Sequence, residues 1–164
     1  MALLAVLAAS TILLGPKLSR GGSDPAMAVD DFGSDAAFVE DYLRRAVGED
    51  YLESSDPEEI AHFLRRELGL ESSLLNLAGL LPTRVEICLL EGRRGAMIVY
   101  HGSSGRSVTH YLVPKLAGER PPRVAREHGG LTVVTWSTDT LEEALVGEVP
   151  PRELLDLAMT GISE

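Results

Sequence analysis

Apolar residues recur along the chain with two periods, and the change of period separates helical from extended segments. They first recur at helical spacing in two stretches. The first predicts a helix over 34–47, with Ser34 as its N-cap. The second predicts a helix that follows the N-cap Asp56 and ends at Gly69. A short edge strand is expected between the two helices, at 50–54.

From Val85 onward the period is two, which is typical of half-buried strands. The strands predicted from this alternation and from the turns between them are 85–90, 96–101, 106–113 and 131–137. A long loop is expected over 114–130. Residues 141–149 fit either a capped helix or a returning strand, and we favour the strand. Pro150 and Pro151 then open a final helix.

Helices that are segregated from a run of strands indicate an α+β fold. We expect an antiparallel sheet of about four to six strands with helices packed against it, preceded by an N-terminal hydrophobic helix. No glycine-rich turn follows a strand and opens a helix, so the sequence shows no dinucleotide-binding or P-loop motif. The predicted organisation is a membrane helix at 1–15, a flexible linker at 16–33 and a folded domain at 34–160.

The apolar start, ALLAVLAASTILLG, has no charged residue. Its apolar part covers 13 residues, or about 20 Å of helix, whereas a membrane span needs ~30 Å. We therefore expect a truncated membrane helix whose remainder lies upstream of Met1. Two alternatives stay open: a buried core helix, and a signal peptide cleaved after the small-x-small motif 26–28. Lys17 and Arg20 favour a cytoplasmic flank, which conflicts with an exported C-terminal domain.

Composition excludes some classes of function. The chain has 164 residues, 15 Lys and Arg against 25 Asp and Glu, and a formal net charge of −10. This acidic balance disfavours nucleic acid as a partner, because phosphate-binding surfaces are basic. The single cysteine, Cys88, excludes an intrachain disulfide and a cysteine-based zinc cluster.

No group of residues in the sequence predicts catalysis, a cofactor or a metal site. His101 and His110 flank one predicted hairpin at least three ladder positions apart, about 10 Å or more, which is too far for one zinc ion. We interpret them as half-exposed strand residues. Cys88 lies in an alternating strand and is interpreted as a small buried hydrophobic residue, and Trp136 as a core residue. A cleft that gathers Cys88 with either histidine would instead indicate an enzyme.

The predicted loop at 114–130 contains a cluster of basic residues, although the chain as a whole is acidic. These residues are Lys115, Arg120, Arg123 and Arg126. Structureless loops of this length are uncommon and often functional or disordered. The loop is therefore either a mobile solubilising segment or a contact for a partner protein or an anionic surface.

Three stretches, 56–64, 108–113 and above all 130–158 (GLTVVTWSTDTLEEALVGEVPPRELLDLA), resemble the extracytoplasmic domain of bacterial transmembrane anti-sigma factors. The resemblance spans about 34–160 and is diffuse. Members of that family begin with a cytoplasmic zinc-binding module bearing His-x3-Cys-x2-Cys, followed by one membrane helix. This sequence lacks that motif, and Cys88 lies in the wrong half of the chain. The resemblance therefore implies the outer half of such a protein, and it implies no catalytic residue.

The predicted function is a non-enzymatic, membrane-anchored regulatory or sensor domain that controls envelope-linked transcription. It would be a single-pass inner-membrane protein, anchored by residues 1–15, with its C-terminal domain extracytoplasmic. Its expected partner is an envelope protein or a protease, and a sigma factor only if an upstream module exists. The alternative is an exported binding or adaptor domain, released by a signal peptidase and without a link to a sigma factor.

Overall fold

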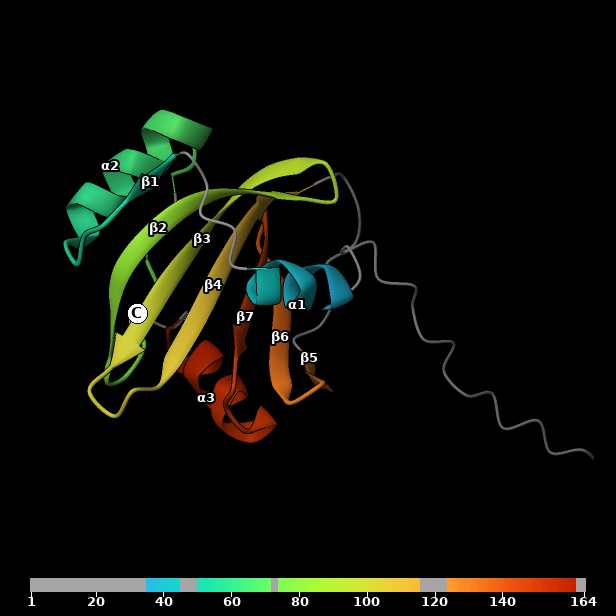
Figure 1. Ribbon diagram of the computed structural model, residues 1–164. Coiled ribbons are helices and arrows are strands. Elements are labelled where there is room, and N and C mark those ends of the chain that lie inside the picture. Colours follow the sequence, from blue (N-terminus) through green and yellow to red (C-terminus); the bar gives the residue numbers. More distant parts are fainter. Residues whose placement is uncertain (1–34, 45–49, 72–73, 116–123, 162–164) are drawn as a thin grey trace, which may run out of the picture.

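An antiparallel sheet of seven strands lies at the centre of the structure, with helices against both of its faces (Figure 1). The computed structural model describes residues 35–44, 50–71, 74–115 and 124–161. Its elements are α1 (Asp35–Arg44), β1 (Tyr51–Leu52), α2 (Pro57–Leu68), β2 (Leu80–Leu90), β3 (Arg93–Gly102), β4 (Ser107–Pro114), β5 (Val124–His128), β6 (Leu131–Ser137), β7 (Leu141–Gly147) and α3 (Pro151–Gly161). Across the sheet the strand order is β1-β2-β3-β4-β7-β6-β5, and every neighbouring pair is antiparallel. The α+β class is therefore confirmed.

Several elements follow the prediction closely, and α2 does so in detail. The Asp56 side chain accepts a hydrogen bond of 2.9 Å from the backbone N–H of Glu58, and Pro57 occupies the first turn. Gly69 ends the helix with φ at 67° and donates to the carbonyl of Arg65 at 2.9 Å. The edge strand β1 and the returning strand β7 are also present as predicted.

Two parts of the prediction are wrong. The sheet has seven strands rather than four to six, and the predicted loop at 114–130 contains β5. The sequence of β5, VAREH, lacks a clear apolar alternation because β5 is an edge strand, where charged residues are common. The predicted membrane helix at 1–15 and linker at 16–33 lie outside the described residues.

The face of the sheet that packs against α2 and α3 is here called the covered face. Side chains from all parts of the sheet meet the two helices there. The helices contribute Ile60, Phe63, Leu64, Leu154, Leu157 and Ala158, and the strands contribute Val85, Ala96, Ile98, Leu112, Val134 and Leu145. All of these side chains are buried, so the covered face forms the larger hydrophobic core.

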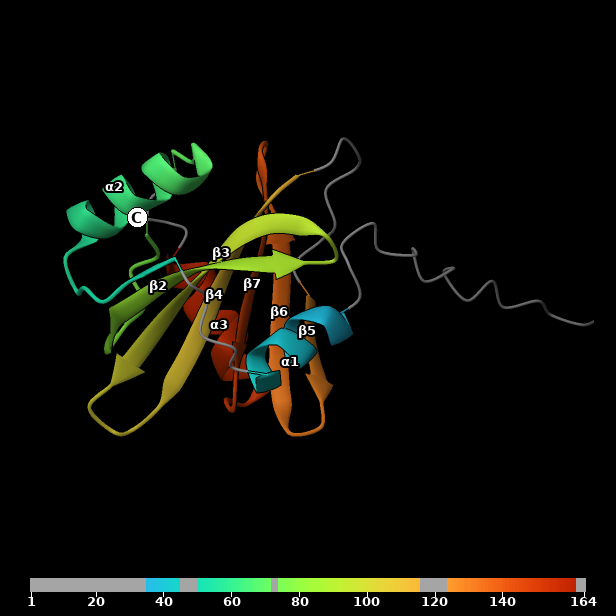
Figure 2. The ribbon, with the colours of Figure 1, turned by 45° about the horizontal axis from the view of Figure 1, so that its top comes forward.

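The opposite face, here called the cleft face, packs against α1 alone among the described helices. Phe38 and Tyr42 of α1 are buried in a smaller cluster with residues of β2, β3, β4, β6 and β7. The β2–β3 hairpin curves strongly toward the side that holds α1 (Figures 1 and 2). Because α1 has only ten residues, about 15 Å of helix, it covers only part of this face.

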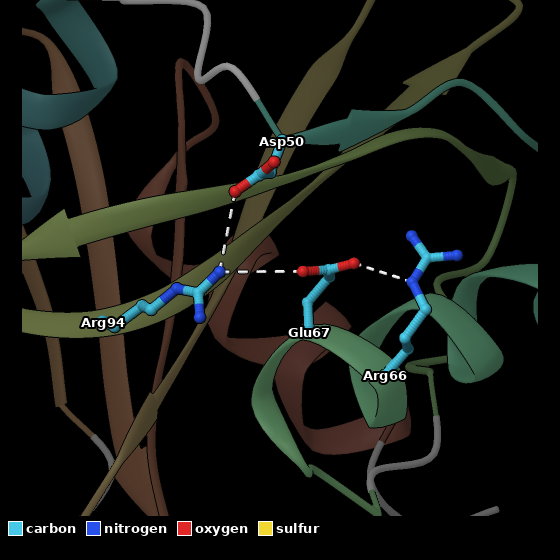
Figure 3. A network of polar contacts seen from close by, with 4 residues as sticks. All are labelled: Asp50, Arg66, Glu67 and Arg94. Atoms are coloured by element: carbon cyan, nitrogen blue, oxygen red, sulfur yellow. Dashed lines mark hydrogen bonds and ion pairs between the residues drawn. The ribbon is translucent and has the colours of Figure 1, made fainter.

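A surface network joins α2 to the edge of the sheet (Figure 3). The Arg94 guanidinium on β3 lies 3.6 Å from the carboxylate of Asp50 and 3.7 Å from that of Glu67 on α2. Glu67 also pairs with Arg66 at 2.7 Å. Apart from the partly buried Glu67, these groups are more than half exposed, so the network contributes little to stability.

Candidate functional site

The part of the cleft face that α1 leaves open forms a cleft of about 280 Å³ between α1 and strands β2, β3 and β4. Its walls combine polar groups with an apolar floor, as small-molecule sites do. The lining residues are Asp41, Tyr42, Arg84, Glu86, Met97, Val99, His101, Ser107, Thr109 and Tyr111. The alternation of β2–β4 brings these side chains to one side of the sheet, and α1 adds the first two.

Asp41 places a carboxylate at the α1 side of the cleft. Its Oδ2 accepts a hydrogen bond of 3.2 Å from the Tyr111 hydroxyl. In the part of the chain that the structure describes, no cation forms an ion pair with this carboxylate within 4.0 Å. Desolvation raises the pKa of Asp41, and the Tyr111 hydrogen bond and the charge of Arg44 only partly oppose this effect.

Arg84 and Glu86 form a second polar group, on β2. The Arg84 Nε lies 2.6 Å from a carboxylate oxygen of Glu86, whose exposed fraction is only 5%. The Arg84 guanidinium also stacks over the Tyr51 ring at 4.3 Å. Its positive charge is therefore balanced by Glu86, although the buried Nε and Nη2 atoms form no hydrogen bond of regular geometry with the described residues.

The remaining lining residues supply the floor and one unsatisfied hydroxyl. Met97 and Val99 of β3 form an apolar floor beside Thr109 of β4, which is 4% exposed. Among the described residues the Thr109 hydroxyl has no hydrogen-bond partner. His101 and Ser107, which are register partners, also line the cleft. Carboxylate and hydroxyl oxygens above an apolar floor are suited to bind a small ligand with N–H donors and a short hydrocarbon part.

Of the four predicted basic residues, the two that the structure describes do not line this cleft. Lys115 follows β4, and its backbone N–H donates to the carbonyl of Thr140 at 2.8 Å. Arg126 lies on β5, and its guanidinium pairs with the carboxylate of Asp35 on α1 at 2.7 Å. Arg120 and Arg123 lie outside the described residues. A partner contact by these four residues stays a prediction, and the structure assigns Arg126 a role within the chain.

The structure does not bring Cys88 and the two histidines together. Cys88 is buried in the cluster under α1, and burial together with the nearby charge of Asp41 raises its pKa to about 12. His101 pairs with Ser107 in the sheet, whereas His110 is three positions away and points to the covered face. The interpretation of Cys88 as a small buried hydrophobic residue agrees with these contacts.

The interpretation of His110 as half-exposed is wrong, because its exposed fraction is 0%. Its Nε2 lies 2.7 Å from a carboxylate oxygen of Glu143 on β7. Its ring stacks on Trp136 at a centroid distance of 5.6 Å, and Trp136 is a core residue as predicted. This buried polar cluster could not be inferred from the sequence, because 33 residues separate the histidine from its partner.

Comparison of the chain with protein-family models, with curated proteins and with solved structures finds no match. Among the described helices, none combines the length and apolar character that crossing a membrane requires. Within the same residues, no group of three or more His, Cys, Asp or Glu could hold a metal ion.

Proposed function

We propose that this chain is a membrane-anchored regulatory or sensor domain that resembles the outer half of an anti-sigma factor. Residues 1–15 would anchor it in the inner membrane as a single pass, with the domain at 34–160 outside the cytoplasm. Support comes from the apolar start, from the resemblance of the domain and from one structural observation. That observation is the position of α1, which follows the predicted linker directly and forms one wall of the cleft.

The contacts between α1 and the sheet, among the described residues, involve a short stretch of the helix. Phe38 and Tyr42 are buried in the hydrophobic cluster, and Ala37 and Val39 pack against it. The polar contacts include those of the Asp35 carboxylate with Arg126 at 2.7 Å and with His128 at 3.4 Å, and the hydrogen bond between Asp41 and Tyr111. A helix of ten residues is not stable in water by itself, so its structure depends on these contacts.

This arrangement supports a mechanism for signal transfer. A molecule in the cleft touches Asp41 and Tyr42, and it therefore changes the free energy with which α1 packs on the sheet. Because α1 continues directly into the predicted linker, such a change reaches the membrane segment and whatever precedes it. A protease or a partner that recognises residues near α1 would then respond to the ligand.

Fractionation of cells that express the chain with a C-terminal tag tests this function. The proposal predicts an uncleaved chain in the inner membrane, degradation of the tagged domain by protease added to spheroplasts, and a defined set of transcripts that changes when the gene is deleted. A soluble mature domain that begins after Ala28, with no change in transcripts, would instead support the alternative of an exported binding domain. A tag protected from protease would contradict both.

A further inference from the structure

We propose that the cleft between α1 and strands β2–β4 binds a small aliphatic ammonium ion. The Asp41 carboxylate and the Thr109 hydroxyl would accept its N–H groups, and its carbon chain would lie over Met97 and Val99. Binding itself does not depend on the proposed function, whereas its consequence for α1 rests on that function.

The charges around the cleft favour a cation over an anion. Asp41 is half-buried and has no ion pair among the described residues, so a bound cation would compensate the cost of its desolvation. The nearby guanidinium of Arg84 is paired with the buried Glu86, so these two charges offset one another and the carboxylate of Asp41 is the remaining charge of the cleft. The chain as a whole has a net charge of −10, which also attracts cations.

A second, independent observation points to a ligand with more than one donor. Thr109 is 4% exposed, lines the same cleft and has no hydrogen-bond partner among the described residues. Its hydroxyl oxygen is not one of the fully buried polar atoms that lack a partner, so it is open to the cleft, and an ammonium group can donate three hydrogen bonds. One group can therefore satisfy both the carboxylate and the hydroxyl.

The volume of the cleft and its apolar floor restrict the size and polarity of the part of the ligand beyond the ammonium group. A volume of about 280 Å³ is at the lower end for small-molecule sites, which favours a short chain over a ring system or a peptide. Met97 and Val99 offer apolar contact and no hydrogen bonds, so an aliphatic body fits them better than a polar one.

Methyl NMR of the full chain in detergent micelles tests this proposal, with n-butylammonium as the probe. The chain has four methionines, of which Met97 lines the cleft and Met159 is an exposed residue of α3, which serves as an internal control. We expect the Met97 methyl signal to shift with a dissociation constant of about 1 mM, while the Met159 signal stays in place. Butan-1-ol and butyrate, which match the chain length without the positive charge, should bind at least tenfold more weakly.

Single substitutions then test whether Asp41 and Thr109 bind the ammonium group. Asp41→Asn keeps the size of the side chain and an acceptor for Tyr111 but removes the charge, and should weaken binding at least tenfold. Thr109→Val keeps the shape and should weaken it about threefold. Glu40→Gln removes the same charge from an exposed position of α1 outside the cleft and should leave binding unchanged.

Three results would overturn the proposal: no Met97 shift with butylammonium, an equal shift with butan-1-ol, or equal weakening by Glu40→Gln and Asp41→Asn. These results would leave the membrane anchor and the transcript response untouched. Conversely, the chain could bind butylammonium and still be released from the membrane. That result would refute the proposed function and support the ammonium site.

Discussion

The two faces of the sheet are stabilised in different ways. On the covered face, α2 and α3 bury a continuous apolar core around the His110–Glu143 pair. On the cleft face, α1 buries two side chains, relies on contacts of Asp35 and Asp41, and leaves a cleft beside it. The comparison indicates that the covered face determines global stability, whereas the cleft face can change at a small cost in free energy.

The largest effect is expected from the buried pair on the covered face. Glu143→Ala leaves His110 buried without its acceptor and should lower the free energy of unfolding by about 3–5 kcal/mol. Urea denaturation followed by tryptophan fluorescence measures this loss, because Trp136 stacks on His110. The matched control is Glu148→Ala at an exposed position, which should cost less than about 0.5 kcal/mol. Equal losses in the two variants would refute the special role of the pair.

Substitutions at two neighbouring residues of β3 allow a direct comparison of the packing on the two faces. Ile98 points into the covered core and is fully buried, whereas Val99 lines the cleft and is partly exposed. Ile98→Ala should cost about 3 kcal/mol in urea denaturation, and Val99→Ala about 1 kcal/mol or less. Equal costs would show that the cleft face is packed as tightly as the covered face.

The carboxyl group of Asp41 should oppose folding when it is ionised. Its pKa is raised by burial, so the folded state favours the protonated acid, and stability is lost as the pH rises from the unfolded-state pKa through the folded-state pKa. Asp41→Asn removes this loss and should stabilise the chain at pH 7 by a few tenths of a kcal/mol, since the group is only half-buried. Denaturation from pH 3 to pH 7 should show a difference between the two proteins that grows with pH. A difference that shrinks with rising pH would contradict the direction of the shift.

The smallest effect is expected from the surface network of Arg94. Both of its ion pairs are longer than 3.5 Å and Arg94 is half-exposed, so Arg94→Ala should change the free energy of unfolding by less than about 0.5 kcal/mol. The change should become smaller still at high salt. A loss above 1 kcal/mol would mean that this network helps to hold α2 on the covered face.

The sequence predicts the elements with strong local signals. The helix that begins at Pro57 has its cap, its proline and its terminal glycine within a few residues of one another, so all of its determinants are local. The apolar residues of β3, β4 and β6 likewise predict these strands locally, although both faces of β4 and β6 are buried. Only β5 was missed, because its outward charged residues hide the pattern of an edge strand.

The sequence does not predict the candidate site, for a physical reason. Asp41 meets Tyr111 across 70 positions, and Thr109 enters the cleft only through the register of β3 with β4. Burial of His110 depends in the same way on Glu143 of a distant strand. Such contacts depend on topology and strand register, which local periodicity does not encode.

The labelling rate of Cys88 tests most directly the claim that α1 detaches more easily than the rest of the fold. Cys88 is the only cysteine of the chain and is buried in the cluster that contains Phe38 and Tyr42. Among the described helices α1 is the one that packs on this cluster, so we expect a thiol reagent to reach Cys88 when α1 moves or when the whole domain unfolds. The variant that weakens the packing of α1 is Arg126→Ala, and the matched control is Arg94→Ala, which removes the same charge at a site that contacts α2 instead.

We predict that Cys88 of the native chain is labelled faster than global unfolding allows, and about fivefold faster still in Arg126→Ala, which corresponds to roughly 1 kcal/mol. The Arg94→Ala variant should be labelled at the wild-type rate. Labelling of all three proteins only at the rate of global unfolding would contradict the claim, because α1 would then be as firmly held as the helices of the covered face.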